Sequence, residues 1–192
     1  MADFINHTNR PENLHENRPK FEPEKQTEFE PEYHRARLIH ILQMAYSGEL
    51  AAALAYAGHW RAAWKRSERQ DIRRIEMDEW HHRASLLKML DELGAKPVAW
   101  RDLMMRTIGS VIFLACFVSG WYMPMYFAGR LEQANIKEYE EAAYHASGLG
   151  LEHYAAMIKV FAQKEVEHEQ YFFNLIAKHW LTPIMKSVFH YG

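Results

Sequence analysis

The sequence has a single cysteine and almost no excess of charge, and each shortage argues against a class of function. One cysteine, Cys116, cannot form an internal disulfide or a metal site built from several thiolates, and it fits a reducing compartment. A net charge of −2 gives no overall basic field, so we expect no nucleic-acid partner. The first residues lack the apolar core of a secretory signal peptide, so we expect a cytoplasmic protein.

Strand-like patterns are also missing. No stretch alternates apolar and polar residues over a sustained length, which predicts an all-α protein. Residues 1–31 hold four of the seven prolines and have almost no apolar periodicity, so we predict a disordered or loosely packed arm there. Residues 32–192 are long enough to bury the core of one domain.

Within this domain the apolar periodicity predicts four long helices, one apolar crossover and a short terminal helix. Ser67 with Gln70 resembles a capping box at the start of the second helix, and Gly94 followed by Pro97 marks its end. The crossover, residues 107–129, contains no charged residue. The expected long helices span residues 33–66, 67–94, 124–148 and 151–178, and the terminal helix begins at 182.

Two Glu-x-x-His motifs are the most informative pattern: Glu79 with His82, and Glu165 with His168. Residues at i and i+3 lie on one face of a helix, about one turn apart, so both side chains can reach the same ion. One such pair is common on helix surfaces. Here each pair follows a carboxylate in an apolar stretch, Glu49 before the first pair and Glu132 before the second, at a similar distance along the chain. This repetition indicates a metal site.

The two preceding carboxylates are identified by their neighbours. Glu49 is the only acid between Tyr33 and Ser67 and has apolar residues on every side. Burying a carboxylate without a partner costs several kcal/mol, so a buried Glu normally pairs with a cation or binds a metal. Glu132 is favoured over the other acids of its helix because its helical neighbours are mostly apolar.

Helices that contribute Glu, Glu-x-x-His, Glu and Glu-x-x-His are what a four-helix bundle needs to hold two iron or manganese ions. The separation of Glu49 from Glu132 is nearly the same as that of Glu79 from Glu165, which suggests two hairpins related by a pseudo-twofold axis. One long crossover would join them, as in the ferritin-like variant of the bundle. We expect Glu79 and Glu165 to bridge the ions, with Glu49 and Glu132 as terminal ligands. The sequence does not identify acceptors for the outer nitrogens of the two histidines.

Other polar residues lie near these motifs. Tyr56 and Tyr139 follow Glu49 and Glu132 by two helical turns, and we interpret them as packed tyrosines. The alternative is a catalytic role, in a hydrogen-bond network around the metals or in electron transfer. Glu76, three residues before Glu79, is a candidate substitute ligand or a hydrogen-bond partner of the ligands. Four residues are interpreted as surface residues: His81, His153, Glu167 and Glu169.

These residues resemble a known family, the Coq7-type demethoxyubiquinone hydroxylases. Ser47-Gly48-Glu49, running on to Tyr56-Ala57-Gly58, is similar to the family's first ligand helix. Glu79-x-x-His82 and Lys164-Glu165-Val166-Glu167-His168 are similar to its second and fourth ligand helices, and Glu132 with Tyr139 is similar to its third. The resemblance covers roughly residues 36–178. The chain departs from the family at Glu138, where a histidine is usual.

The resemblance implies a di-iron monooxygenase, an oxidoreductase that uses O2 to hydroxylate a hydrophobic aromatic or quinone precursor in ubiquinone biosynthesis. Two Fe ions would be its cofactors, with Mn as the alternative. Three other functions stay open: ferritin-like iron handling or peroxide scavenging, hydroxylation of another substrate such as a modified tRNA base, and a helical binding module without metal. A homo-oligomer or a partner protein is also compatible with the sequence.

The apolar crossover supports a hydrophobic substrate. It is long enough to span a membrane, but Gly120 and Pro124 interrupt it and it leads directly into the Glu132 helix. A core helix is the plainer alternative. We favour a segment at the membrane surface, with Arg101, Arg106 and Arg130 near lipid headgroups, which predicts a peripheral membrane protein.

Overall fold

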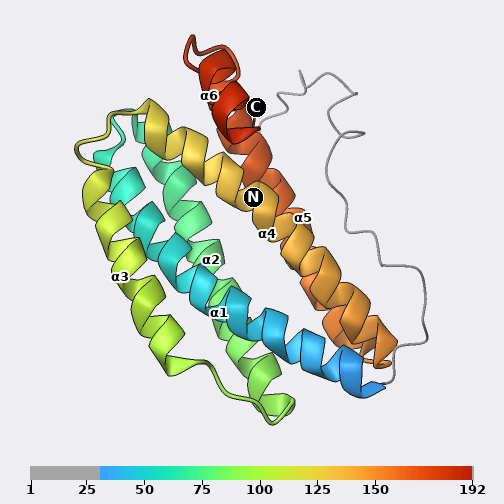
Figure 1. The fold of residues 1–192 in the computed structure, drawn as a ribbon. Helices are drawn as coiled ribbons and strands as arrows, with labels where there is room; N and C mark the ends of the chain where they lie inside the picture. The colour runs from blue at the N-terminus through green and yellow to red at the C-terminus, as the bar shows by residue number, and fades with distance from the viewer. Residues whose placement is uncertain (1–30, 192) are drawn as a thin grey trace.

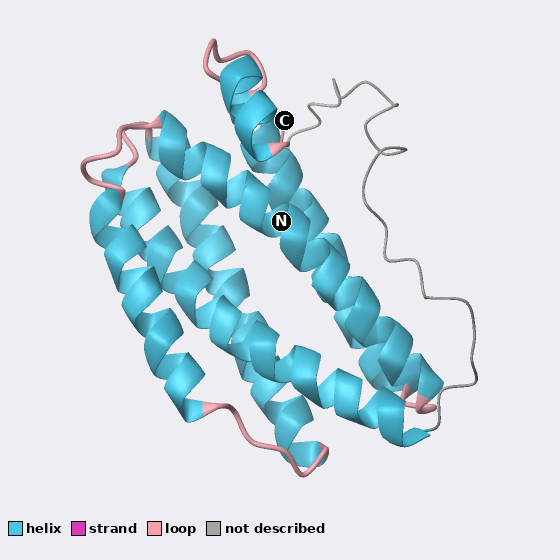
Figure 2. Ribbon diagram, viewed as in Figure 1, coloured by secondary structure: helices cyan, strands magenta, loops and turns pink. Residues whose placement is uncertain are grey.

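The structure is a computed structural model in which residues 31–191 are described. These residues form six α-helices and no strand (Figures 1 and 2), which confirms the predicted all-α class. The predicted arm, apart from its last residue, lies outside the described residues. That last residue, Pro31, is instead the first residue of α1, because the fixed φ and missing N–H of proline suit a first helical turn.

The four long helices form two hairpins. α1 (Pro31–Ala62) packs against α2 (Arg66–Glu92), and α4 (Tyr122–Gly148) packs against α5 (Glu152–Ile176). The hairpins meet where α1 contacts α4 and α2 contacts α5. α3 (Ala99–Ala115) crosses between the hairpins along the outside of α1, and α6 (Thr182–Phe189) follows α5 (Figure 1).

The predicted ends of α2 have different outcomes. The predicted capping box of Ser67 and Gln70 is wrong: Lys65 is the residue before the helix, and no side chain caps the helix. Ser67 already lies in the first turn. In the same turn Glu68 Oε1 lies 3.0 Å from Lys65 Nζ. The stop at Gly94 is confirmed. Gly94 has a φ of +67°, which glycine adopts without steric cost, and the chain turns there.

α3 approaches α1 closely at two glycines. A Cβ placed on Gly58 would lie 2.5 Å from the carbonyl oxygen of Phe113, and one placed on Gly109 would lie 2.8 Å from that of Ala51. These contacts are with backbone atoms, which cannot move aside without shifting a whole helix. The two glycines therefore set the distance between α1 and α3.

Gly58→Ala is expected to destabilise the protein by about 1–3 kcal/mol, because the added methyl group must push α3 away. Gly48→Ala, in the same helix, is the matched control, since a Cβ there meets nothing within 4 Å. That control should gain about 0.5–1 kcal/mol from helix propensity. Urea unfolding followed by circular dichroism measures both changes, and equal effects of the two substitutions would contradict the close approach.

The predicted apolar crossover is a helix followed by a turn. α3 ends at Ala115, residues 116–121 turn at Gly120 with a φ of +75°, and α4 begins at Tyr122. Within α3 only Gly109 is buried. Four of its large apolar side chains are more than 60% exposed: Trp100, Leu103, Val111 and Leu114. α3 therefore presents an apolar surface that the described chain leaves uncovered.

Among the described residues, α1 alone is long and apolar enough to cross a membrane, judged by length and composition. Half of that apolar stretch is buried inside the protein. Core helices of soluble proteins pass the same test, so this is weak evidence for a membrane-associated protein.

Candidate metal centre

Six buried acidic and histidine side chains meet between the two hairpins. They come from α1, α2, α4 and α5, and none is more than 5% exposed. Because each lies on the inward stripe of its helix, the four helices bring them to one point. All six are the predicted ligands: Glu49, Glu79, His82, Glu132, Glu165 and His168.

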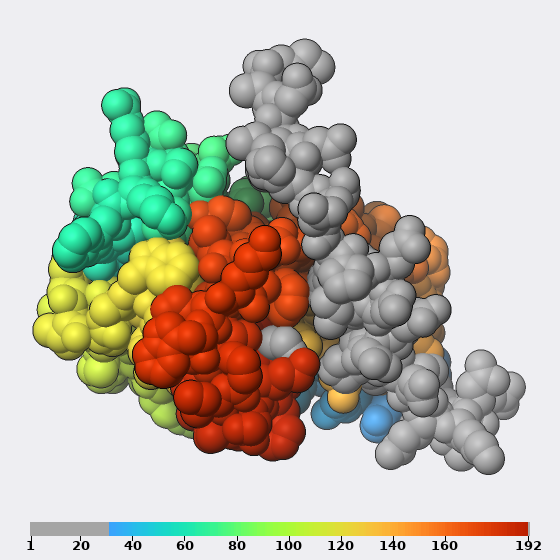
Figure 3. Space-filling model, turned by 90° about the horizontal axis from the view of Figure 1, so that it is seen from above, coloured from blue at the N-terminus to red at the C-terminus, as the bar shows by residue number. Residues whose placement is uncertain are grey.

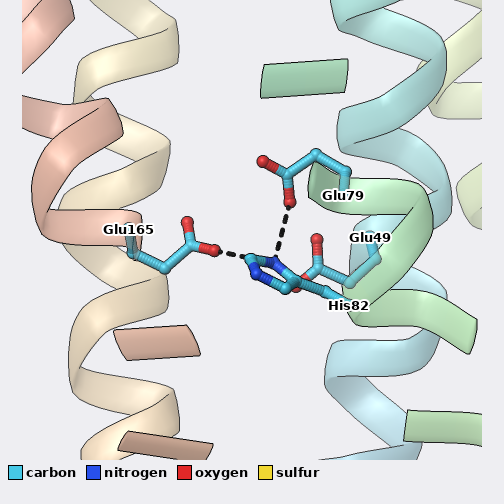
Figure 4. Close-up of side chains that lie close together, drawn as sticks. All are labelled: Glu49, Glu79, His82 and Glu165. Atoms are coloured by element: carbon cyan, nitrogen blue, oxygen red, sulfur yellow. Dashed lines mark ion pairs between the residues drawn. The ribbon is translucent and has the colours of Figure 1, made fainter. Parts of the chain in front are cut away.

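These side chains form two overlapping groups. In each group the four ligand atoms lie within 4.8 Å of one another. Each group could hold one metal ion and is named for that candidate role. The first metal position consists of Glu49, Glu79, His82 and Glu165 (Figure 4). The second metal position consists of Glu79, Glu132, Glu165 and His168. Glu79 and Glu165 belong to both, as their predicted bridging role requires.

The polar atoms at the centre are close to one another but poorly satisfied. His82 Nδ1 lies 3.1 Å from Glu165 Oε1 and 3.5 Å from Glu79 Oε2, and His168 Nδ1 lies 3.3 Å from Glu79 Oε1. Within the described part of the chain, neither nitrogen and neither Glu79 oxygen makes a directed hydrogen bond. Buried polar atoms normally have partners. A cation would satisfy all of these atoms at once, and carboxylate and imidazole donors suit Fe(II) or Mn(II).

The charges at this centre also call for a cation. Burial, followed by repulsion from Glu79 and Glu165, raises the pKa of Glu49 well above its usual value, and burial and repulsion do the same to Glu132. Burial and then repulsion from Glu79 raise the pKa of Glu165 to about 8. Burial also opposes ionisation of His168, but contacts with Asp78 and Glu79 outweigh it and raise the pKa to about 10. Four carboxylates in one buried space cannot all ionise unless positive charge joins them.

Two buried tyrosines hold the terminal carboxylates. Tyr139 of α4 donates a hydrogen bond to Glu49 of α1, and Tyr56 of α1 donates one to Glu132 of α4. Each tyrosine thus reaches across to the carboxylate of the other hairpin. The tyrosines are packed as predicted, and each donates a hydrogen bond to a predicted ligand. The alternative, a catalytic role, stays a prediction.

The sequence did not identify Asp78 and Asn135 as part of this site. Asp78 Oδ2 lies 3.1 Å from His168 Nε2 and supplies the acceptor that the sequence left unassigned. Asn135 Nδ2 lies 3.4 Å from oxygens of both Glu132 and Glu165. Asn135 follows Glu132 by one helical turn on the same helix face, so the sequence could have predicted its place near the centre. The sequence could not have predicted the contact of Asp78 with His168, because the two residues lie on different helices.

The predictions for the residues beside the motifs are confirmed in part. His81, His153 and Glu167 are exposed as predicted. Glu169 is not: it is 2% exposed, because the C-terminal segment covers it and Tyr191 donates to it at 3.4 Å. Glu76 is outside both metal positions and instead accepts a hydrogen bond from Trp60 Nε1 at 2.6 Å.

His59 is a buried histidine at the edge of the centre. It is 4% exposed, and its ring stacks on those of Tyr56 and Phe172 at centroid distances of 6.4 and 5.7 Å. Its Nε2 has no hydrogen-bond partner among the described residues. Burial lowers its pKa from 6.5 to about 4, so it is neutral at neutral pH.

His59 is expected to make the folded state less stable in weak acid. Between pH 6.5 and about 4 the unfolded chain binds a proton at this residue and the folded chain does not, so stability falls as the pH falls. The full loss is about 3 kcal/mol. His59→Phe, which keeps a stacked ring, should remove this part of the pH dependence in chelator-treated protein. His40→Phe, at an exposed histidine, should retain it, and identical pH profiles for the two variants would contradict the prediction.

We compared the chain with protein families, curated proteins and solved structures, and none shows significant similarity to it. The resemblance to the Coq7-type hydroxylases therefore rests on the sequence motifs and stays a prediction.

Proposed function

We propose that this protein is a ferritin-like di-iron monooxygenase that hydroxylates a hydrophobic aromatic or quinone precursor, as in ubiquinone biosynthesis. The observation that carries the proposal is the pair of buried metal positions that share Glu79 and Glu165. Two hairpins joined by a single crossover, each contributing one Glu and one Glu-x-x-His, match the ferritin-like arrangement of ligands.

The residues of the centre have distinct roles in this proposal. Two bound ferrous ions would supply two electrons to O2 and so allow a substrate carbon to be hydroxylated. Glu79 and Glu165, which belong to both metal positions, would hold the two ions. Tyr56 and Tyr139 orient the terminal carboxylates through their hydroxyl groups, and the burial of every ligand excludes bulk water. Manganese suits the same donors.

A hollow at one end of the molecule supports a hydrophobic substrate. It has a volume of about 850 Å³, within the range of small-molecule sites, and lies between the α1–α2 turn and the segment that precedes α4. Figure 3 shows these two segments, in teal and yellow, next to each other at this end of the molecule. Trp64, Phe117 and Trp121 are among its walls. His59 also lines it, and its ring stacks on Tyr56, which donates to Glu132. The ring of His59 thus lies between the hollow and Tyr56, the tyrosine that donates to the predicted ligand Glu132.

The exposed face of α3 supports a peripheral place on a membrane. Its apolar side chains could enter the lipid interface, while the exposed Arg106 of the same helix meets headgroups. Arg130, which the sequence also assigned to the headgroups, donates instead to the carbonyl oxygen of Phe189 in α6 at 3.4 Å. Arg101 is less available than the sequence suggested, because it is half-buried and donates to Ser47 Oγ at 2.9 Å. In this proposal the protein is cytoplasmic and takes its substrate from the membrane.

The proposed reaction can be tested by analysing the quinones extracted from cells that lack the gene. We expect a precursor that lacks one ring hydroxyl or methoxyl group to accumulate. The unaltered gene and a Glu167→Gln variant should restore the normal profile, whereas Glu49→Gln should not. Glu167 is an exposed residue beside the second motif and so controls for expression and folding.

Two other results would redirect the proposal. A normal quinone profile in the deleted strain, with iron still bound by the purified protein, would favour iron handling or another substrate. Fewer than about one Fe or Mn per chain after anaerobic loading would overturn the metal centre itself.

A further inference from the structure

The ligands of the two metal positions are related by a consistent exchange of residues. Glu49 and Glu132 are separated by the same number of residues as Tyr56 and Tyr139. The two Glu-x-x-His motifs, at Glu79 and Glu165, are separated by a slightly larger number. The crossed tyrosine hydrogen bonds follow the same exchange, since each tyrosine binds the terminal carboxylate of the other hairpin. The inner part of the centre is therefore close to twofold symmetric.

The residues around the histidines break this symmetry. Asp78 lies 3.1 Å from His168 Nε2, and the residue just before the second motif, where its counterpart would be, is Lys164. A lysine has no acceptor for a histidine N–H. Lys164 instead donates to Glu167 at 2.8 Å. The contacts of His82 with carboxylates are made through Nδ1, so within residues 31–191 its Nε2 has no carboxylate beside it.

The residues around the carboxylates also break the twofold symmetry, and they favour the same metal position. Asn135 lies 3.4 Å from Glu132 and from Glu165, and its counterpart, one turn after Glu49, is Ala52. Alanine has no side-chain donor, so nothing at that place orients Glu49 as Asn135 orients Glu132. Asp78 and Asn135 thus each contact a side chain that belongs only to the second metal position, His168 and Glu132 respectively, and Asn135 also contacts the shared Glu165.

We propose that the two metal positions are inequivalent: the second fills first and binds its ion more tightly, with Asp78 and Asn135 as the positioning residues. An acceptor at Nε2 fixes the proton there, which leaves Nδ1 as the lone pair for the metal and holds the ring in place. The amide of Asn135 lies 3.4 Å from two carboxylates that would bind the ion and so restrains their orientation. The inference rests on the two-metal centre of the proposed function but not on its substrate or reaction.

Anaerobic titration with Mn²⁺, followed by calorimetry and chelator competition, tests this order. The unaltered chain should bind two ions with dissociation constants at least about tenfold apart, since loss of such outer contacts typically costs 10–100-fold in affinity. Glu49 belongs only to the first metal position and Glu132 only to the second. Glu49→Gln should therefore retain the tighter ion, and Glu132→Gln should lose it.

Substitution of the positioning residues completes the test. Asp78→Ala should weaken the tighter ion by about 10–100-fold and leave the weaker one within about threefold. Asp71→Ala is the matched control, because Asp71 is on the same helix with a side chain 35% exposed, against 41% for Asp78. Lys164→Asp, which gives His82 a nearby acceptor, should tighten the weaker ion and narrow the gap.

Two outcomes would overturn the inference. One is equal affinity for the two ions in the unaltered chain. The other is an equal loss at both positions in Asp78→Ala, which would indicate a general structural role. In either case two ions still bind, so the proposed function would survive. Binding of no ion would overturn both proposals together.

Discussion

Replacement of Glu165 by glutamine is expected to abolish tight binding of both metal ions. Glu165 belongs to both metal positions, so one substitution removes a carboxylate from each. Loss of a direct charged ligand should weaken each position by more than ~100-fold, since loss of an outer contact alone typically costs 10–100-fold. Metal content after anaerobic loading and desalting, measured by plasma mass spectrometry, should fall from about two ions per chain to well below one.

The same variant should fold at least as well as the unaltered chain when both are free of metal. Burial raises the pKa of Glu165 to about 8, so at neutral pH the metal-free side chain is mainly the neutral acid, which glutamine matches in size and charge. Loss of metal can then be separated from loss of structure by comparing melting temperatures in chelator.

Two substitutions serve as controls for this experiment. Glu49→Gln affects the first metal position alone and should leave one ion bound. Glu167→Gln, close to Glu165 in sequence but exposed, should leave both ions bound. If Glu165→Gln retained one ion with unchanged affinity, Glu165 would not be shared between the positions, and the bridging role would be wrong.

Metal loading is expected to produce the largest change in stability. The metal-free core holds four buried carboxylates and two histidines that compete for protons, whereas bound cations compensate their charge. At a free metal concentration about 1,000 times the dissociation constant, each position contributes about 4 kcal/mol to the folded state. For a protein of this size such a gain at both positions corresponds to a rise in melting temperature of roughly 15–30 °C.

Differential scanning calorimetry with and without anaerobic Mn²⁺ measures this rise, and a strong chelator should reverse it. Glu165→Gln should show almost none of it. A rise below about 3 °C in the unaltered protein at saturating metal would mean that the cluster contributes little binding energy, in conflict with a metal centre.

The helices and the six side chains of the candidate metal centre were predictable because both depend on local spacing. Helical periodicity is a property of neighbouring residues, and it indicated every helix to within a few residues except for the extent of the crossover. A Glu and a His at i and i+3 share a helix face in any fold, so the two motifs could be identified without knowledge of the packing. Glu49 was identifiable because an acid in an apolar stretch needs a partner.

The sequence by itself therefore determined the all-α class and the six side chains of the centre. Only the tertiary structure decided which groups surround them. Asp78 reaches His168 and Tyr139 reaches Glu49 from distant parts of the chain, and Glu169 is buried by a C-terminal segment that packs back over it. Such contacts depend on how the helices are rotated and shifted against one another, which local periodicity does not specify. The inequivalence of the two metal positions could for this reason be inferred only after the helices were placed.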